Sequence, residues 1–371
     1  MNEGNGAGSI LLISPEPWEG HFVSKHHYAV TLAGRGFHVY FLNPPDVSAP
    51  SVQIRKTDYE NVWSVSAPLV AKGLRFYPAW LRRRVEARWL RKLEQQIGEE
   101  FSAVWLFENS RFYDMHFAGQ RTKIYHQVDL NQDFHVKQAA KTADVCFANT
   151  DAIMKRLAPY NAKVYKIRHG VAMPTTKPML TEEQNGRFVK DAVNAVYIGN
   201  LDIGYLNNDL LAELVQRFQN VRFHFVGRYS EKGTLYLRCG GNTNVSWWGA
   251  VPSALIPVIL SYCDIQLLTY RVETAWEKEQ MASPHKVMEY LASGKVIVAT
   301  YTDEYKEGHG LLEMVAESED YLRKFDEVTS NIDHYNGITK QQERIAFAQD
   351  NTYPKQLERI ITILNKHHLK L

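Results

Sequence analysis

The sequence has few cysteines and no long apolar run, and these absences exclude several classes of protein. Its three cysteines, Cys146, Cys239 and Cys263, are far apart. Their spacing matches no metal-binding or redox motif, so we expect free thiols in a reducing compartment. No apolar stretch approaches the ~20 residues that cross a bilayer, and residues 1–9 lack a secretion signal pattern. We therefore expect a cytoplasmic protein, peripheral on the inner face of the cell membrane.

An excess of charge of either sign is also missing. The chain has 43 Lys and Arg against 41 Asp and Glu, a net charge of +2, which gives no global attraction to nucleic acid. A hydrophobic content of 45% and a charged content of 23% are typical of a globular protein, and 371 residues are enough for two domains. No Asp-x-Asp motif follows a predicted strand, and no metal is predicted.

Short apolar runs alternate with helical patterns along the whole chain, which predicts an α/β fold with parallel sheets. Helices are expected over residues 25–33, 72–92 and 207–218 and from residue 351. Strands are expected over residues 10–13, 37–42, 62–66, 103–107, 123–127, 144–148 and 163–167, and then over 195–198, 221–226, 245–248, 265–268 and 296–299. This order corresponds to two Rossmann-like halves.

The most informative stretch is 283–300. Ser283 can cap a helix whose first position is Pro284, and Gly294 can end it in the left-handed conformation. A helix N-terminus favours anions, and Lys286 adds a positive charge there, with Glu289 one turn further on. An ammonium suits a diphosphate and a carboxylate suits ribose hydroxyls, so the pattern indicates a nucleotide-diphosphate site. The alternative is an ordinary surface ion pair between Lys286 and Glu289.

This stretch, with Asp264–Arg271 before it, resembles the donor-site signature of GT-B glycosyltransferases, above all the bacterial group 1 enzymes that build surface polysaccharides. The shared pattern is Pro-x-Lys-x-x-Glu-Tyr-Leu-Ala-x-Gly-Lys. The resemblance implies two Rossmann-like domains facing an interdomain cleft. It also implies that Lys286 contacts the donor diphosphate and Glu289 the ribose, with Ser283 and His285 beside them. A UDP-sugar is the expected donor, and no separate cofactor is expected.

Two departures from the family pattern affect the donor site. Retaining relatives often carry Arg and Lys after the first strand of the second half, where this chain has Gly199 and Asn200, and a Glu where Met281 stands. Arg228 and Arg271 could supply the missing charge. Tyr270 could stack on a base or pack in the core, and His169 could contact the donor or cap a turn. Without the usual residues, inversion is slightly favoured over retention.

A catalytic base is expected where the strand over 123–127 ends. Transfer to a hydroxyl requires that its proton be removed, which an Asp or His can do. Asp129 is the first candidate, with His126 and Asp133 after it and Glu108 as an outsider. The alternative is that Asp129 caps a helix that begins near Gln132.

The segment 72–92 is strongly basic, with eight Lys and Arg against one acid, Glu86. Trp80, Leu81, Val85, Trp89 and Leu93 recur at helical spacing. A basic amphipathic helix with tryptophans can lie on an anionic membrane, which would suit a lipid-linked acceptor. We expect Trp80, Arg82, Arg83, Arg84, Arg88 and Trp89 to form this surface. The alternative is that the apolar stripe packs on the sheet and the arginines are only solvated.

The sequence is therefore interpreted as a glycosyltransferase that moves a sugar from a nucleoside-diphosphate sugar to a glycan or lipid-linked glycan hydroxyl. Two other functions stay open, a nucleotide-sugar 2-epimerase on the same fold and a non-catalytic membrane-associated protein that binds nucleotide sugars. The expected partners are the nucleotide sugar, the acceptor and an anionic membrane surface, without nucleic acid. The expected domains are an N-terminal acceptor-side domain over 1–172, a linker over 173–190, a nucleotide-sugar domain over 191–350 and a returning helix over 351–371.

Overall fold

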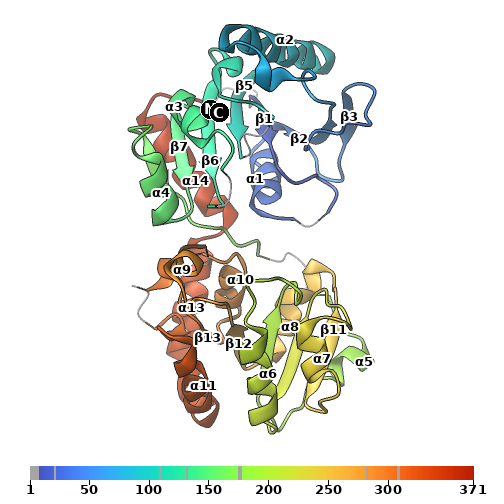
Figure 1. Ribbon diagram of the computed structural model, residues 1–371, viewed down its shortest axis with the longest axis vertical. Helices are drawn as coiled ribbons and strands as arrows, with labels where there is room; N and C mark the ends of the chain where they lie inside the picture. Colours follow the sequence, from blue (N-terminus) through green and yellow to red (C-terminus); the bar gives the residue numbers. More distant parts are fainter. Residues whose placement is uncertain are drawn as a thin grey trace, which may run out of the picture. The chain divides into compact units, whose positions relative to one another are not determined.

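The computed structural model describes residues 8–20, 22–107, 111–130, 133–173, 178–280, 283–306 and 310–371. The chain forms two compact units (Figure 1). Unit 1 comprises residues 1–170 together with 353–371, and unit 2 comprises residues 171–352, including the stretch 173–190. Each unit is built on one sheet covered by helices.

The sheet of unit 1 has eight strands in the order β3-β4-β2-β1-β5-β6-β7-β8, all parallel except β3, which is antiparallel to β4. The short, mostly apolar central strands are typical of a parallel sheet buried on both faces. The strands are β1 (Ser9–Ile13), β2 (His38–Leu42), β3 (Gln53–Lys56), β4 (Val62–Ser66), β5 (Phe101–Leu106), β6 (Thr122–Gln127), β7 (Val145–Ala148) and β8 (Val164–Lys166).

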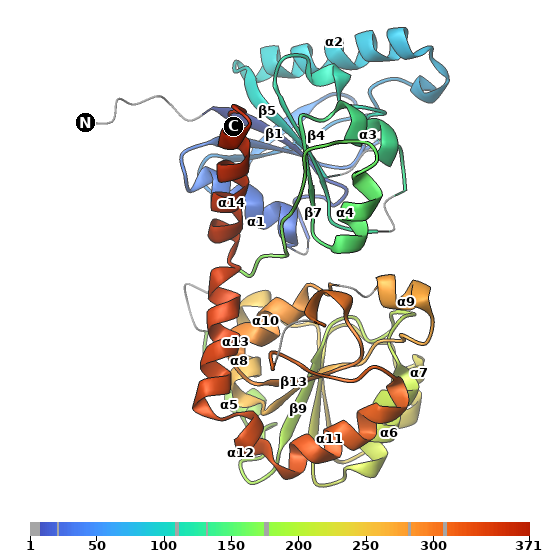
Figure 2. The same ribbon diagram turned by 90° about the vertical axis from the view of Figure 1, so that its left-hand side faces the viewer.

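Alternate residues of each strand enter two separate cores. Leu11 and Ile13 of β1 pack with α2 (Ala79–Ile97), α3 (Val136–Thr142) and α4 (Asp151–Leu157). Ile10 and Leu12 pack with α1 (Ser24–Ala33) and α14 (Tyr353–Lys366). Figure 2 shows α1 and α14 together on one side of this sheet. The two-residue period of a strand thus fixes which helices each side chain meets.

The sheet of unit 2 has six parallel strands in the order β11-β10-β9-β12-β13-β14 around one continuous core. The strands are β9 (Asn194–Ile198), β10 (Arg222–Val226), β11 (Val245–Gly249), β12 (Ile265–Leu268), β13 (Val296–Ala299) and β14 (Glu313–Met314). The helices are α5 (Glu182–Asn185), α6 (Asn208–Arg217), α7 (Thr234–Cys239), α8 (Ile256–Tyr262), α9 (Ala275–Gln280), α10 (Lys286–Ser293), α11 (Tyr321–Ser330), α12 (Ile332–Tyr335) and α13 (Ile338–Asp350). The predicted pair of Rossmann-like halves is confirmed.

A buried arginine fastens the C-terminal end of α10. Gly294 ends this helix at φ 77°, as the sequence predicts. Arg344 of α13 is fully buried and donates to the carbonyls of Gly294, Tyr335 and Leu311 at 3.1, 3.0 and 3.3 Å. Because buried carbonyls need donors, Arg344 stabilises the end of α10 and, with it, the position of the whole helix.

The exposed surface of α2 differs from the expected one at Arg82. Trp80 is 62% exposed, whereas Arg82 and Glu86 are buried beside Leu90 and Leu93. Trp80 is therefore at the surface, as expected, whereas Arg82, which was expected there too, is not. The polar residues can be buried because the segment that follows β5 provides partners for them.

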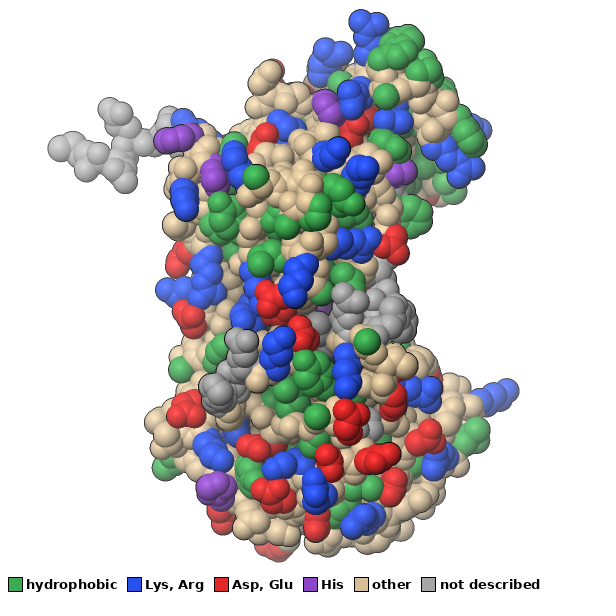
Figure 3. Space-filling model, turned by 60° about the vertical axis from the view of Figure 1, so that its left-hand side comes forward, with side chains coloured by type: hydrophobic (Ala, Val, Ile, Leu, Met, Phe, Trp, Pro, Cys, Tyr) green, Lys and Arg blue, Asp and Glu red, His purple; other side chains and the backbone are tan. Residues whose placement is uncertain are grey.

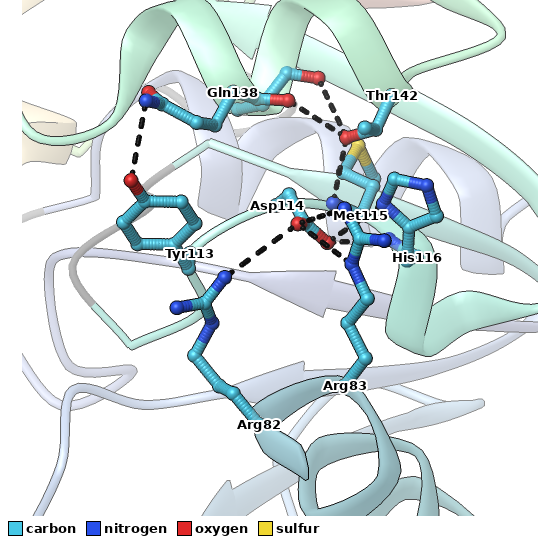
Figure 4. Close-up of polar contacts among 9 residues, drawn as sticks. Arg82, Arg83, Tyr113, Asp114, Met115, His116, Gln138 and Thr142 are labelled. Atoms are coloured by element: carbon cyan, nitrogen blue, oxygen red, sulfur yellow. Dashed lines mark hydrogen bonds and ion pairs between the residues drawn. The ribbon is translucent and has the colours of Figure 1, made fainter. Parts of the chain in front are cut away.

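Asp114 is the centre of this polar cluster (Figure 4). Arg83 donates through Nε and Nη2 to Oδ2 of Asp114, both at 3.2 Å. The guanidinium of Arg82 stacks 3.8 Å from the ring centroid of Tyr113, with Nη2 3.9 Å from Asp114. Burial and the charge of Asp114 raise the pKa of Glu86 to about 8, while Arg82, Arg83 and the Tyr113 N–H act in the opposite direction.

Candidate functional site

Glycines follow three neighbouring strands of unit 2 at the carboxyl edge of the sheet, where ligands of open α/β sheets bind. Gly199, Gly227 and Gly249 come at the ends of β9, β10 and β11 with φ of 145°, 137° and 69°. Gly199 N–H donates to Val226 and Gly227 N–H donates to Gly249, both at 2.8 Å. A Cβ on Gly227 would overlap the carbonyl oxygen of Gly199. The backbones therefore approach each other so closely that only glycine fits at residue 227.

Lys286, the first residue of α10, reaches this edge. Its Nζ lies 4.0 Å from the ring centroid of Tyr197 and 5.2 Å from that of Tyr270. A Cβ on Gly199 would come within 2.7 Å of the same atom, so the glycine leaves room for the ammonium. Desolvation lowers the pKa of Lys286 to about 7, and the charge of Glu289 opposes this shift. An anion bound here would contact the Lys286 ammonium and the backbone of Gly199, which has no side chain to exclude it.

Glu289 lies one turn along α10 from Lys286. Desolvation by the surrounding protein raises the pKa of Glu289 to about 7, and the charge of Lys286 opposes the rise. The side chain is nevertheless exposed, and its contact with solvent favours the ionised form more than full burial would. The carboxylate is thus open to a ligand.

The start of α10 differs from the expected start. The helix begins at Lys286 with His285 as its N-cap residue, and no side chain caps it. Ser283 therefore does not cap the helix, although Val287 N–H donates to the Pro284 carbonyl at 3.1 Å. His285 is exposed. The turn that precedes α10 is closed by backbone hydrogen bonds rather than by a serine hydroxyl.

The remaining donor-site candidates of unit 2 lie in different surroundings. Tyr270 is 3% exposed and its ring meets Tyr205 edge-on, with centroids 5.3 Å apart, so it packs inside the unit beneath Lys286. Arg228 and Arg271 follow β10 and β12 and are exposed. Met281 lies outside the described residues.

The candidates of unit 1 are placed just as unevenly. Asp129 is exposed two residues after β6, and its carbonyl accepts from the Gln127 side chain at 3.0 Å. The helix α3 begins at Val136 without a side-chain cap, so Asp129 does not cap it. Asp133 is exposed and forms an ion pair with Arg156. Glu108 lies outside the described residues.

His126 lies inside the core of unit 1. Its ring is stacked on Phe107 and Trp105, with centroid distances of 4.9 and 6.0 Å, and is 1% exposed. Burial lowers the pKa of His126 to about 3, with a smaller contribution from Lys25. This histidine is neutral at physiological pH and lies against apolar rings rather than at the surface.

His169 is buried where unit 1 ends. The Asn149 amide donates to the Val128 carbonyl at 2.8 Å and lies 2.6 Å from Nε2 of His169. Because both contacts use the amide nitrogen as donor, the ring accepts at Nε2. The same amide thus fixes His169 and the backbone next to Asp129.

The sequence reasoning missed several residues of this edge. Tyr197 and Gly227 were not singled out, although a glycine directly after a strand was a usable signal. A cavity of about 340 Å³ was missed as well; it is lined by Asp202, Asn208, Ser230, Lys232, Gly233 and Thr234. No spacing rule could have joined these residues, because they come from the loops after β9 and β10 and from the first residues of α6 and α7.

Within the ranges given above, no three His, Cys, Asp or Glu side chains are grouped so that they could hold a metal ion. No helix in the same ranges is long and apolar enough to cross a bilayer. The three cysteines are buried free thiols, as expected.

Residues 192–331 match a family model described as Glycosyl transferases group 1. No curated relative matches the chain by sequence. Among solved structures, the chain is similar to one from E. coli described as trehalose-6-phosphate bound with UDP-2-fluoro glucose, at 12% identity and TM-score 0.67, covering 96% of this chain and 98% of that one. It is also similar to Anabaena Alr3699/HepE in complex with UDP and glucose, at 14% identity, TM-score 0.66 and coverage of 97% and 100%.

A third similar structure is WaaG, a glycosyltransferase involved in lipopolysaccharide biosynthesis, at 11% identity, TM-score 0.61 and coverage of 95% and 99%. At such low identities these structures show the fold alone. Together with the family model, they confirm the predicted GT-B pair of Rossmann-like domains.

Proposed function

We propose that the chain is a group 1 glycosyltransferase and that it transfers a sugar from a UDP-sugar to a hydroxyl of a glycan or lipid-linked glycan, with inversion. The single observation that carries the proposal is the position of Lys286. Its ammonium lies at the carboxyl edge of the unit 2 sheet, 2.7 Å from where a Cβ on Gly199 would be. A diphosphate at this place would gain a charge-assisted contact.

The proposed donor contacts follow from the two residues of α10. Lys286 would bind the diphosphate, and the exposed Glu289 would accept hydrogen bonds from the ribose hydroxyls. Arg228 and Arg271, both exposed at the same edge, would add positive charge. UDP is proposed as the nucleotide because two similar proteins are described with UDP or a UDP-sugar.

Asp129 is the proposed catalytic base. In a single displacement with inversion, the acceptor oxygen attacks the anomeric carbon while the base takes its proton and the nucleoside diphosphate leaves. The exposed carboxylate of Asp129, two residues after β6, is accessible to a substrate hydroxyl, whereas His126 is enclosed by rings. Asp133, which is already paired with Arg156, is the matched control.

The proposed membrane surface is the N-terminal part of α2 with the turn before it. Trp80 and Phe76 are 62% and 77% exposed, and Arg84 and Arg88 are exposed beside them. Figure 3 shows Lys and Arg side chains interspersed with hydrophobic ones around α2. Two of the expected residues lie elsewhere: Arg82 is buried, and Trp89 is half-buried against Phe112, with ring centroids 5.7 Å apart. Exposed aromatic and basic side chains favour an anionic lipid surface.

The donor site is tested by thermal-shift measurements with UDP, GDP, dTDP and CMP. At about 100 times its dissociation constant a ligand stabilises a protein by ~2.7 kcal/mol, which gives a clear rise in melting temperature. We expect a rise with UDP that is lost in Lys286→Ala and kept in Lys295→Ala, which lies at the opposite end of α10. If no nucleotide stabilises the wild type, the proposal is wrong.

The reaction is tested by product analysis with a UDP-sugar and a set of glycan acceptors. Transfer should require an acceptor and should be lost in Asp129→Asn but kept in Asp133→Asn. An epimerised nucleotide sugar formed without acceptor would identify an epimerase. For the membrane surface, Trp80→Ala with Arg84→Ala should lower binding to vesicles that contain phosphatidylglycerol, whereas Leu237→Ala in unit 2 should not.

A further inference from the structure

We propose that Tyr197 and Tyr270 are positioning residues that hold the Lys286 ammonium ready for the donor diphosphate. This inference rests on the proposed function, because it concerns how the same site receives its anion. Tyr197 lies in β9 and Tyr270 follows β12, and these two strands are neighbours in the sheet. Both rings lie close to Lys286, the first residue of α10.

The rings make contacts that fit a cation. Nζ of Lys286 lies 4.0 Å from the Tyr197 centroid and 5.2 Å from the Tyr270 centroid, within the ~6 Å at which a cation is attracted by an aromatic face. Both tyrosines are almost fully buried, at 1% and 3% exposure. This burial limits rotation of either ring. The ammonium thus rests on two rigid faces.

Aromatic faces hold a lysine differently from a carboxylate. In an ion pair the carboxylate cancels the charge that a diphosphate would bind, whereas a neutral ring attracts the cation and leaves its charge in place. In the part of the chain that the structure describes, Lys286 makes no ion pair, and Glu289 acts on it only through its charge. Gly199 has no side chain to cover the ammonium from the other side.

The same surroundings couple binding to protonation. Desolvation among the rings lowers the pKa of Lys286 to about 7, so the free protein holds this proton only partly at neutral pH. A bound diphosphate stabilises the ammonium and raises its pKa, and binding therefore takes up a proton. We expect the affinity for UDP to fall as the pH rises from 6 to 9.

The experiment is calorimetric titration of UDP across that pH range into wild type, Tyr197→Phe, Tyr197→Leu, Tyr270→Phe and Tyr270→Leu. At pH 6, where Lys286 is mostly protonated in every variant, the Phe variants keep a ring and should bind within about threefold of wild type, whereas the Leu variants should lose about tenfold in affinity. In the Leu variants water reaches the ammonium, so its pKa rises and the fall in affinity moves to higher pH. Tyr229→Leu is the control, because Tyr229 stacks on Tyr236 and contacts Trp247 instead.

A merely structural role of the tyrosines would not move the pH profile. Folded Leu variants with wild-type affinity and profile would overturn the inference. If these variants do not fold, phenylalanines with increasing fluorination at residue 197 keep the shape of the ring while they withdraw charge from its face. The affinity should then fall with each fluorine, and a flat response would overturn the inference.

The two proposals fail separately. Absence of UDP binding by wild type refutes the proposed function. Binding that depends on Lys286 but not on the tyrosine rings refutes only the positioning role.

Discussion

Replacing Glu86 with glutamine should stabilise unit 1 above neutral pH, although the residue is fully buried. Its carboxyl group lies on the buried face of α2 near Asp114, and its pKa is raised from 4.5 to about 8. Burial is the main cause and the charge of Asp114 is the second, while Arg82, Arg83 and the Tyr113 N–H oppose them. Glutamine has the same shape and carries no charge to bury.

The sign and the size of the effect follow from the proton balance. Between pH 4.5 and 8 the folded chain keeps the proton of Glu86 while the unfolded chain releases it, so stability is fully present below 4.5 and is lost as the pH rises through 8. At 1.36 kcal/mol for each pH unit, the loss is at most about 5 kcal/mol. Relaxation of the cluster makes a few kcal/mol the expected order of magnitude.

The assay is urea unfolding of wild type and Glu86→Gln from pH 5 to pH 9. The matched control is Glu94→Gln on the same helix, because Glu94 accepts from Arg121 through Nε at 2.7 Å and Nη2 at 2.6 Å and from Phe101 N–H at 2.9 Å. Breaking a buried pair costs about 3–5 kcal/mol. Glu94→Gln should therefore destabilise the protein and identify the transition that belongs to unit 1.

Two results would refute the reasoning. One is a wild-type urea midpoint for that transition that does not decrease as the pH is raised from 5 to 9. The other is an equally steep fall in Glu86→Gln, which would assign the pH dependence to another group.

Three further variants test other parts of the structure. Gly227→Ala should destabilise unit 2 by several kcal/mol because its Cβ would overlap the Gly199 carbonyl, whereas Gly241→Ala meets no atom within 4 Å and should be neutral in urea unfolding. Burial lowers the pKa of His224 from 6.5 to about 3, so the unfolded chain binds its proton first and stability falls as the pH drops below 6.5. In a pH series of melting temperatures, His224→Asn should weaken this fall, and an unchanged slope would contradict the assignment. Arg344→Met leaves three carbonyls without their donor and should lower the free energy of unfolding in urea by several kcal/mol. A loss below about 1 kcal/mol would show that water replaces the guanidinium.

Much of the fold could be predicted because the strands of a buried parallel sheet appear in the sequence as short apolar runs. Residues 62–66, 265–268 and 296–299 were expected as strands and have those bounds. Edge elements were harder: β3 is polar, with the sequence Gln-Ile-Arg-Lys, and pairs only with β4. The expected donor residues of α10 lie together because one helical turn joins them, and that distance is fixed by local geometry.

What could not be predicted depends on contacts distant in the sequence. The basic composition of α2 suggested that Arg82 lies at the surface, but Asp114 and Tyr113, about 30 residues away, bury it instead. Likewise, nothing near Lys286 indicates Tyr197, which β9 brings beneath the ammonium. Whether His126 faced solvent also depended on its neighbours, and these are rings from other segments.

The division of the chain between the units has a consequence for synthesis on the ribosome. Unit 2 is one continuous segment, residues 171–352, whereas unit 1 needs residues 353–371 as well. Until α14 emerges, the apolar surface that Leu357, Ile360 and Leu364 cover in unit 1 stays open to solvent. Unit 2 can therefore complete its fold before unit 1, although the synthesis of unit 1 begins first. A chain cut after residue 352 would keep all of unit 2 but would leave unit 1 with exposed apolar surface, and such a chain is a natural substrate for chaperones.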